Sequence, residues 1–93
     1  GRMQRNTKFK VTFGIVPAYG STKKGLEVDG ISKPDGPAAK AGILKGDVIK
    51  SMDGKRINDI YEFMDRLEEL KPGMTITVLI DRSGTELELP VTF

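Results

Sequence analysis

The 93-residue sequence predicts an α+β domain dominated by antiparallel strands, a partly open barrel of five or six strands capped by one short and one longer helix. Short apolar runs alternate with polar residues and are separated by turn residues. A single long stretch, residues 59–71, has helical spacing, and the last two runs face each other across a Ser-Gly turn. The length suits one domain.

The first extended run covers residues 7–16 and contains a glycine at the centre of its apolar residues. Phe13 and Ile15 flank Gly14, and Pro17 follows shortly after. Glycine weakens a strand interior, and proline cannot donate to a ladder. We interpret the run as an edge strand in which the glycine lets another backbone come close to it.

The second strand is expected over residues 26–31, after a polar loop at residues 19–24. Residues 32–36, SKPDG, have the composition of a turn. Pro37 then stands at a first helical position and Gly42 just past a last one. Proline at the start and glycine after the end predict a very short helix.

The remaining strands are marked by the turns between them. Residues 48–52 form the third predicted strand, which the Asp-Gly pair at 53–54 closes. Residues 74–80 alternate apolar and polar side chains, and residues 85–93 do the same. The Ser-Gly pair at 83–84 therefore predicts a hairpin between them.

The longer helix has start and stop signals of its own. Asp59 is placed to cap it, and Glu62 stands three residues later as in a capping box. Pro72 and Gly73 end it. Glu62 and Arg66 are spaced to form an ion pair across one turn. Its apolar positions at helical spacing are Ile60, Phe63, Met64, Leu67 and Leu70.

Composition excludes several classes of function. The chain has no cysteine and no histidine, so it has no disulfide, no thiolate and no imidazole ligand or base. Fifteen basic and thirteen acidic residues leave a net charge of +2, too weak to indicate nucleic acid as the partner. No apolar run approaches the ~18 residues of a membrane span. We expect no cofactor, no nucleic acid partner and no membrane insertion.

No arrangement of side chains predicts catalysis. Ser51 stands beside Lys50 and Ser83 beside Arg82, but a Ser-Lys pair needs a buried lysine of lowered pKa. A metal site at Asp47 is less convincing than a local role, because an Asp that follows a glycine can accept hydrogen bonds from loop N–H groups. We therefore expect this chain not to be an enzyme.

Residues 36–57, GPAAKAGILKGDVIKSMDGKRI, resemble the signature of bacterial PDZ domains, and the resemblance extends from Phe13 to the end of the chain. It implies the bacterial, permuted strand order, in which the strand that faces the ligand opens the domain. The matching positions are Pro37, Ala38, Ala41, Gly42, Gly46, Asp47, Ile49 and Gly54.

The resemblance implies a peptide groove with a carboxylate-binding loop, because successive N–H groups converge on an anion where a glycine permits the turn. A peptide would then add to the following strand. The resemblance also implies which residues form each part of the groove. The carboxylate-binding loop is Thr12, Phe13, Gly14 and Ile15, and the strand that pairs with the peptide is Ile15, Val16 and Pro17. The groove positions of the helix are Ile60, Tyr61, Met64, Leu67 and Glu68. Phe13, Ile15, Met64 and Leu67 would form the pocket for the last apolar side chain, Tyr61 and Glu68 the rim, and Phe63 and Leu70 the core.

The segments FGIVPAY and DIYEFMDRL are most similar to PDZ domains of extracytoplasmic zinc aminopeptidases, and next to those of periplasmic serine proteases of the high-temperature-requirement type. This implies an extracytoplasmic module of a bacterial peptidase, more similar to the zinc type, whose partner is a peptide or protein C-terminus. The alternative is an accessory domain that docks on its own parent peptidase. Gly1 is typical of a cloning remnant, and we expect a tail at residues 1–6 and a monomeric domain at residues 7–93, cut from a longer protein.

Overall fold

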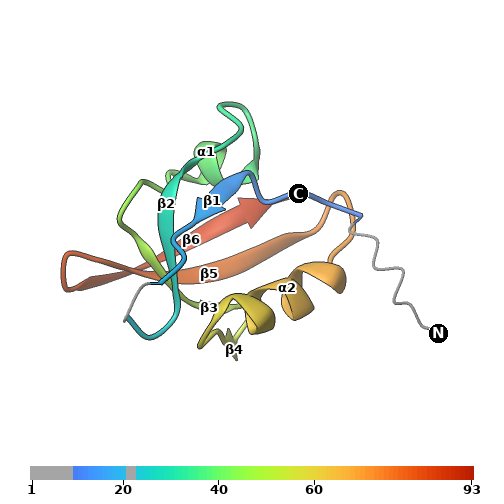
Figure 1. Cartoon of the computed structure of the whole chain (residues 1–93). Helices are drawn as coiled ribbons and strands as arrows, with labels where there is room; N and C mark the ends of the chain where they lie inside the picture. Colours follow the sequence, from blue (N-terminus) through green and yellow to red (C-terminus); the bar gives the residue numbers. More distant parts are fainter. Residues whose placement is uncertain (1–9, 21–22) are drawn as a thin grey trace.

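The computed structural model of the chain describes residues 10–20 and 23–93. In this part the backbone forms six strands of one antiparallel sheet and two α-helices (Figure 1). The predicted α+β class, mainly antiparallel with one short and one longer helix, is confirmed. The elements are β1 Ile15–Pro17, β2 Leu26–Ile31, α1 Pro37–Ala41, β3 Val48–Met52, β4 Lys55–Arg56, α2 Ile60–Glu68, β5 Thr75–Arg82 and β6 Thr85–Thr92.

The sheet has the strand order β1-β2-β3-β5-β6, and the short β4 pairs with β3. The predicted hairpin is its longest part, with β5 and β6 paired without interruption from Thr75↔Thr92 to Arg82↔Thr85. Figure 1 shows α1 and α2 above and below this hairpin in the view. β1 pairs with β2 and ends the strand order, so the expected edge position of the first strand is confirmed.

The predicted length of the first strand is wrong. The strand begins at Ile15, and the described residues before it, 10–14, have no regular structure. The Phe13 carbonyl accepts a hydrogen bond from the Ala38 N–H (3.1 Å), and Gly14 has a φ of 85°. These two features take the backbone out of the β conformation, while residues 7–9 lie outside the described part of the chain.

Both helices begin where their signals predict. α1 has Pro37 in its first turn, and Gly42 follows it with a left-handed φ of 92°. At α2, the Glu62 N–H donates to Asp59 Oδ1 (2.9 Å), and Glu62 Oε1 accepts from the Asn58 N–H (2.8 Å). A capping box therefore forms, but its second hydrogen bond differs from the usual one. Glu62 accepts from the N–H of Asn58, the residue before the cap, rather than from that of Asp59.

The end and the surface pairing of α2 differ from the prediction. The helix ends at Glu68, because the next N–H groups bond three residues back, Glu69 to Arg66 and Leu70 to Leu67 (both 3.1 Å). Such bonds tighten a last turn. The predicted Glu62–Arg66 ion pair is wrong: Glu62 caps the helix, and Arg66 pairs with Glu69 at 3.4 Å.

The core lies where the sheet meets the helices, and aromatic rings connect it to the loop before β1. Phe13 stacks on Phe63 of α2 with ring centroids 5.5 Å apart, and its centroid is 5.6 Å from that of Phe93. Phe63 and Leu70 are buried, as expected for core positions. Among residues 10–20 and 23–93, no helix has the length and apolar character that a membrane crossing requires.

Candidate functional site

Gly14 occupies a backbone position that other residues adopt with difficulty. Its φ is 85°, and a Cβ added to it would lie 3.3 Å from the Lys33 Cβ. A β-branched residue would be strained by the conformation and crowded by this neighbour. The loop at residues 12–15, which we call the Gly14 loop, therefore depends on glycine for its shape.

The carbonyl groups of the Gly14 loop point toward the body of the domain. The Phe13 carbonyl accepts from Ala38 in α1, and the Gly14 carbonyl accepts from the Ser32 N–H (2.9 Å) and the Lys33 N–H (3.4 Å). In a trans peptide the following N–H points the opposite way, and the described peptide bonds include no cis bond. The N–H groups of Gly14 and Ile15 therefore point away from α1 and the turn at residues 32–33, and that of Gly14 has no acceptor among the described residues.

The register of β1 determines which of its backbone groups face outward. Gly14 and Ala18 both bond toward the β2 side, through Ser32 N–H to Gly14 O and Ala18 N–H to Glu27 O (both 2.9 Å). Backbone groups alternate in direction along a strand. Ile15 and Pro17 are one residue away from Gly14 and Ala18. Their backbone groups therefore point the opposite way, to the open edge of the sheet. Ile15 offers an N–H and a carbonyl there, and Pro17 offers a carbonyl alone.

The α2 residues predicted for the groove have very different exposures. Tyr61 is 75% exposed and Met64 38%, whereas Leu67 is 8% exposed. Ile60 and Glu68 are half-buried. Leu67 belongs to the same buried cluster as Phe63, so its side chain contributes mainly to the core rather than to an open groove wall.

The four residues predicted to form the side-chain pocket divide in the same way. Phe13, at 2% exposure, and Leu67 are part of the core. Ile15 is half-buried and Met64 is exposed. Ile15 and Met64 are therefore the two members of this set that remain accessible at the surface.

An open pocket of about 190 Å³ lies where the end of β1 approaches the start of α2. It brings the predicted groove residue Ile60 together with Ala18 and Tyr19. The site residues predicted from the sequence did not include Ala18 or Tyr19, because both follow the strand in a polar segment. The 79% exposure of the Tyr19 side chain shows that it takes no part in the core.

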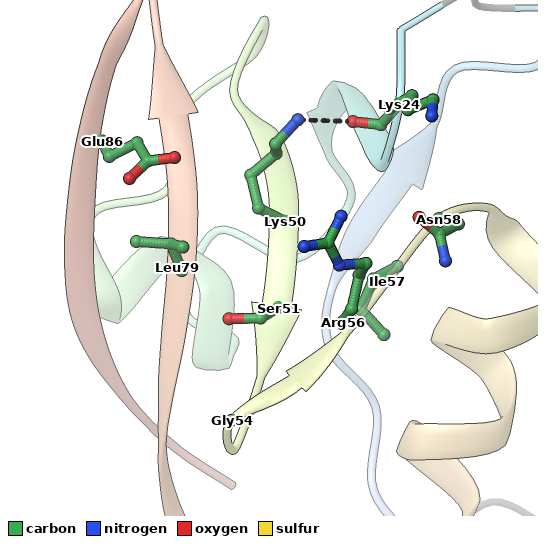
Figure 2. Close-up of a pocket in the computed structure, with 9 residues that line it drawn as sticks. All are labelled: Lys24, Lys50, Ser51, Gly54, Arg56, Ile57, Asn58, Leu79 and Glu86. Carbon is green, nitrogen blue, oxygen red and sulfur yellow. Dashed lines mark hydrogen bonds between the residues drawn. The ribbon is translucent and has the colours of Figure 1, made fainter.

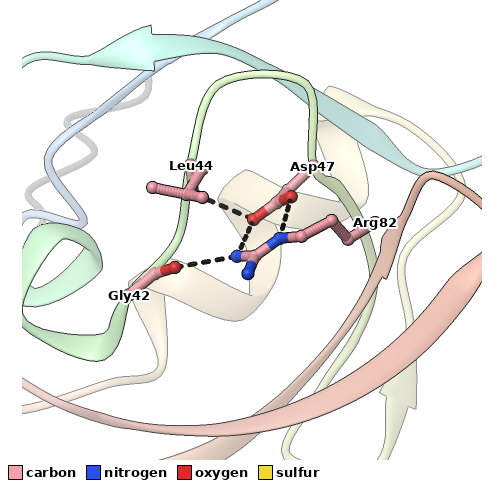
Figure 3. Close-up of polar contacts among 4 residues, drawn as sticks. All are labelled: Gly42, Leu44, Asp47 and Arg82. Carbon is pink, nitrogen blue, oxygen red and sulfur yellow. Dashed lines mark hydrogen bonds and ion pairs between the residues drawn. The ribbon is translucent and has the colours of Figure 1, made fainter.

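Asp47 has a local role, as interpreted from the sequence, and also a distant partner (Figure 3). The side chain is 2% exposed, and its Oδ2 accepts from the Leu44 N–H (2.8 Å). Arg82 donates to it through Nε (2.9 Å) and Nη2 (2.8 Å), and Nη2 also donates to the Gly42 carbonyl (2.8 Å). The hydrogen bond from Arg82 to Asp47 raises the pKa of the guanidinium.

This network accounts for Asp47 without a metal ion. Its carboxylate oxygens accept three hydrogen bonds, two of them from a guanidinium fork. The described part of the chain contains no group of three or more His, Cys, Asp or Glu side chains that could hold a metal. Nothing in the sequence around Arg82 indicated this contact, which joins residues 35 positions apart.

Comparison with known proteins shows that the chain is similar to parts of several peptidases. Residues 6–93 match the family model described as PDZ domain. Serine endoprotease DegS of Escherichia coli K12 is 44% identical over 69 residues, which are 74% of this chain and 19% of DegS. The chain thus spans about a fifth of the length of that relative.

Solved structures agree on the fold. An aminopeptidase N family protein from Idiomarina loihiensis superposes with a TM-score of 0.82 at 26% identity, covering 97% of this chain and 15% of that one. The HtrA-type protease AlgW with a decapeptide superposes with a TM-score of 0.79 at 26% identity, covering 89% of this chain and 28% of that one. With a family match over nearly its whole length, and with the fold and loop described above, the chain belongs to the PDZ domain family.

Proposed function

We propose that this PDZ domain binds the C-terminal segment of a peptide, with the terminal carboxylate at the Gly14 loop and the segment added as a strand along β1. The observation that supports this most is the direction of the loop backbone. The carbonyls of Phe13 and Gly14 are bonded inward, and the Gly14 N–H has no acceptor among the described residues. Successive N–H groups that point away from the body of the domain can bind an anion.

The edge of β1 extends the same argument along the ligand. Ile15 directs an N–H and a carbonyl outward, so a peptide backbone can exchange hydrogen bonds with it. The last side chain of the ligand would then lie over Ile15 and Met64, with Phe13 and Leu67 beneath. An apolar C-terminal residue suits these neighbours, since each of the four is apolar.

The natural setting of the domain, on this proposal, is a larger extracytoplasmic peptidase. The relatives found are peptidases of more than one kind, a serine endoprotease and an aminopeptidase N family protein among them. The FGIVPAY resemblance favours the zinc aminopeptidase type for the parent and supports the extracytoplasmic location. AlgW, which was solved with a decapeptide, supports a peptide as the ligand.

Titration with matched peptides tests the proposal. Peptides with an apolar C-terminal residue should bind with a Kd of roughly micromolar order, as expected of a small transient interface. Amidating the same peptide removes the charge that the N–H groups favour, and should weaken binding about tenfold, ~1.4 kcal/mol. In NMR spectra the amide signals of Gly14 and Ile15 should shift with the acid form. Equal affinity for acid and amide would contradict the carboxylate loop.

A second candidate function is docking on the parent enzyme. It is suggested by the small share of each relative's length that this chain spans. The chain spans 19% of DegS, 28% of AlgW and 15% of the Idiomarina protein, so comparable parents contain much further protein surface. If the isolated domain binds no peptide while hydrogen exchange at β1 slows within a full-length parent, docking replaces peptide capture.

A further inference from the structure

The sheet carries a hollow of about 360 Å³ near β3, β4 and β5 (Figure 2). Leu79 lies at its base and alternates along β5 with the fully buried Val78 and Ile80. The hollow therefore lies on the face of the sheet that points away from the core. The lining residues that matter here are Lys24, Lys50, Arg56, Ile57, Leu79 and Glu86.

Cations dominate the charged groups around this hollow. Lys24, Lys50 and Arg56 line it together with a single carboxylate, Glu86. Lys50 Nζ donates to the Lys24 carbonyl (2.9 Å), and Figure 2 shows the Lys50 and Arg56 side chains extending toward the Lys24 end. Within the described chain, neither Lys50 nor Arg56 is ion-paired with Glu86. In the part of the chain that the structure describes, no ion pair neutralises Lys24, Lys50 or Arg56.

A second open hollow, of about 380 Å³, adjoins the first and shares Lys24 and Lys50 with it. It adds Lys23, which pairs with Glu27 at 3.4 Å, and Asp81. Four cationic and two acidic side chains thus line the two hollows. We call this surface the basic strip: Lys23, Lys24, Lys50 and Arg56 with Leu79 at its base.

We propose that the basic strip binds an acidic polypeptide segment, rich in Asp or Glu, on the face of the sheet away from the core. Charge complementarity indicates the sign of the partner. The partly exposed Leu79 side chain suits a polypeptide, whose side-chain stems can pack on it. No residue of the strip belongs to the Gly14 loop, β1 or α2, so both surfaces can be occupied at once.

Nucleic acid fits this surface less well than an acidic polypeptide. The residues that line the two hollows include no aromatic side chain on which a base could stack. Asp81 and Glu86 stand among the cations and would repel the regularly spaced phosphates of a backbone. A segment of separate carboxylates can avoid both acids.

The test uses a fluorescein-labelled hexaglutamate peptide and fluorescence anisotropy in ~20 mM salt, where surface charges are weakly screened. The double variant Lys50→Gln/Arg56→Gln lowers the net charge of the chain from +2 to 0. The control Lys40→Gln/Lys71→Gln makes the same change at exposed positions outside the strip. We expect the first pair to weaken binding about tenfold and the control less than about twofold.

Equal weakening by the two double variants would overturn the proposal, because it would assign the attraction to net charge. If the first double variant does not fold, Arg56→Gln alone decides the matter, since the Arg56 side chain has no hydrogen-bond or ion-pair partner among the described residues and Lys50 keeps its bond to Lys24. Tighter binding of labelled hexathymidine at the same residues would also overturn it, in favour of nucleic acid. An unlabelled peptide with an apolar C-terminus should not compete, which separates this result from that of the groove.

Discussion

The loop at residues 42–47 and the Gly14 loop both orient backbone N–H groups, but they differ in what accepts from them. In the first, the buried Asp47 carboxylate accepts from the Leu44 N–H and from Arg82. In the second, the carbonyls are bonded inward, and the Gly14 N–H has no acceptor in the part of the chain that the structure describes.

On the proposed function, this difference separates a loop whose polar groups are satisfied within the fold from a loop whose N–H group is available to a ligand. A buried polar group that meets its partner within the domain stabilises the native state, and loses that stability when the partner is removed. An N–H group without an internal partner gains its hydrogen bond when a ligand supplies the acceptor. Substitutions in the two loops should therefore separate stability from binding.

Asp47→Ala should have the largest effect, on stability. It leaves the Leu44 N–H without its acceptor and removes the buried carboxylate that the partly exposed Arg82 contacts, which should lower the free energy of unfolding by about 1–3 kcal/mol. Urea denaturation measures this loss. Asp35→Ala, at an exposed turn residue, should change the free energy of unfolding by less than ~0.5 kcal/mol. Similar values for the two variants would show that the Asp47 network does not hold the fold.

Gly14→Val should weaken binding of apolar C-terminal peptides at least about tenfold, since the side chain distorts the loop N–H groups. The positive φ also lowers stability by about 1–2 kcal/mol. Gly73→Val is the matched control, because Gly73 has a φ of 91° but lies before β5, outside the groove. The control should lose somewhat less stability, because no atom lies within 4 Å of its added Cβ, and should lose no affinity. A folded Gly14→Val domain that binds normally would exclude this loop as the ligand site.

Pro17→Val should tighten binding of peptides of four or more residues by about two- to tenfold, because valine restores a ladder donor worth roughly 0.5–1.5 kcal/mol. Dipeptides should bind almost unchanged, since they do not reach this position. Pro90→Val changes a proline on the opposite edge strand, β6, and should leave the affinity of every peptide unchanged. No effect of Pro17→Val at any length would favour docking over strand addition.

Met64→Ala should have the smallest effect, about a threefold loss of affinity for peptides that end in an apolar residue, or ~0.7 kcal/mol. Its stability should stay within ~0.5 kcal/mol of the parent, because the side chain is partly exposed. Met74 is a matched control, at 36% exposure against 38% for Met64, and lies outside α2. If Met74→Ala and Met64→Ala reduce affinity equally, α2 does not line the ligand.

Much of the fold follows from signals that act within a few residues. The Asp59 cap, the Pro37 start, the Gly42 stop and the turns before β4 and β6 could each be predicted, because their hydrogen bonds and φ angles involve neighbouring residues. The loop around Gly14 was implied by the resemblance to PDZ domains, whereas the apolar pattern placed Gly14 inside a strand. The start of β1 could not be predicted, since it depends on the bond from Ala38 in α1 to Phe13.

By itself the sequence determined the antiparallel α+β class, the two helix starts and the hairpin, because periodicity, caps and turn residues express local backbone preferences. Only the tertiary structure decided that Leu67 packs in the core, that Arg82 reaches Asp47 and that Lys24, Lys50 and Arg56 share one hollow. The physical reason is distance along the chain. Side chains far apart in sequence meet through strand order and register, which no local preference specifies.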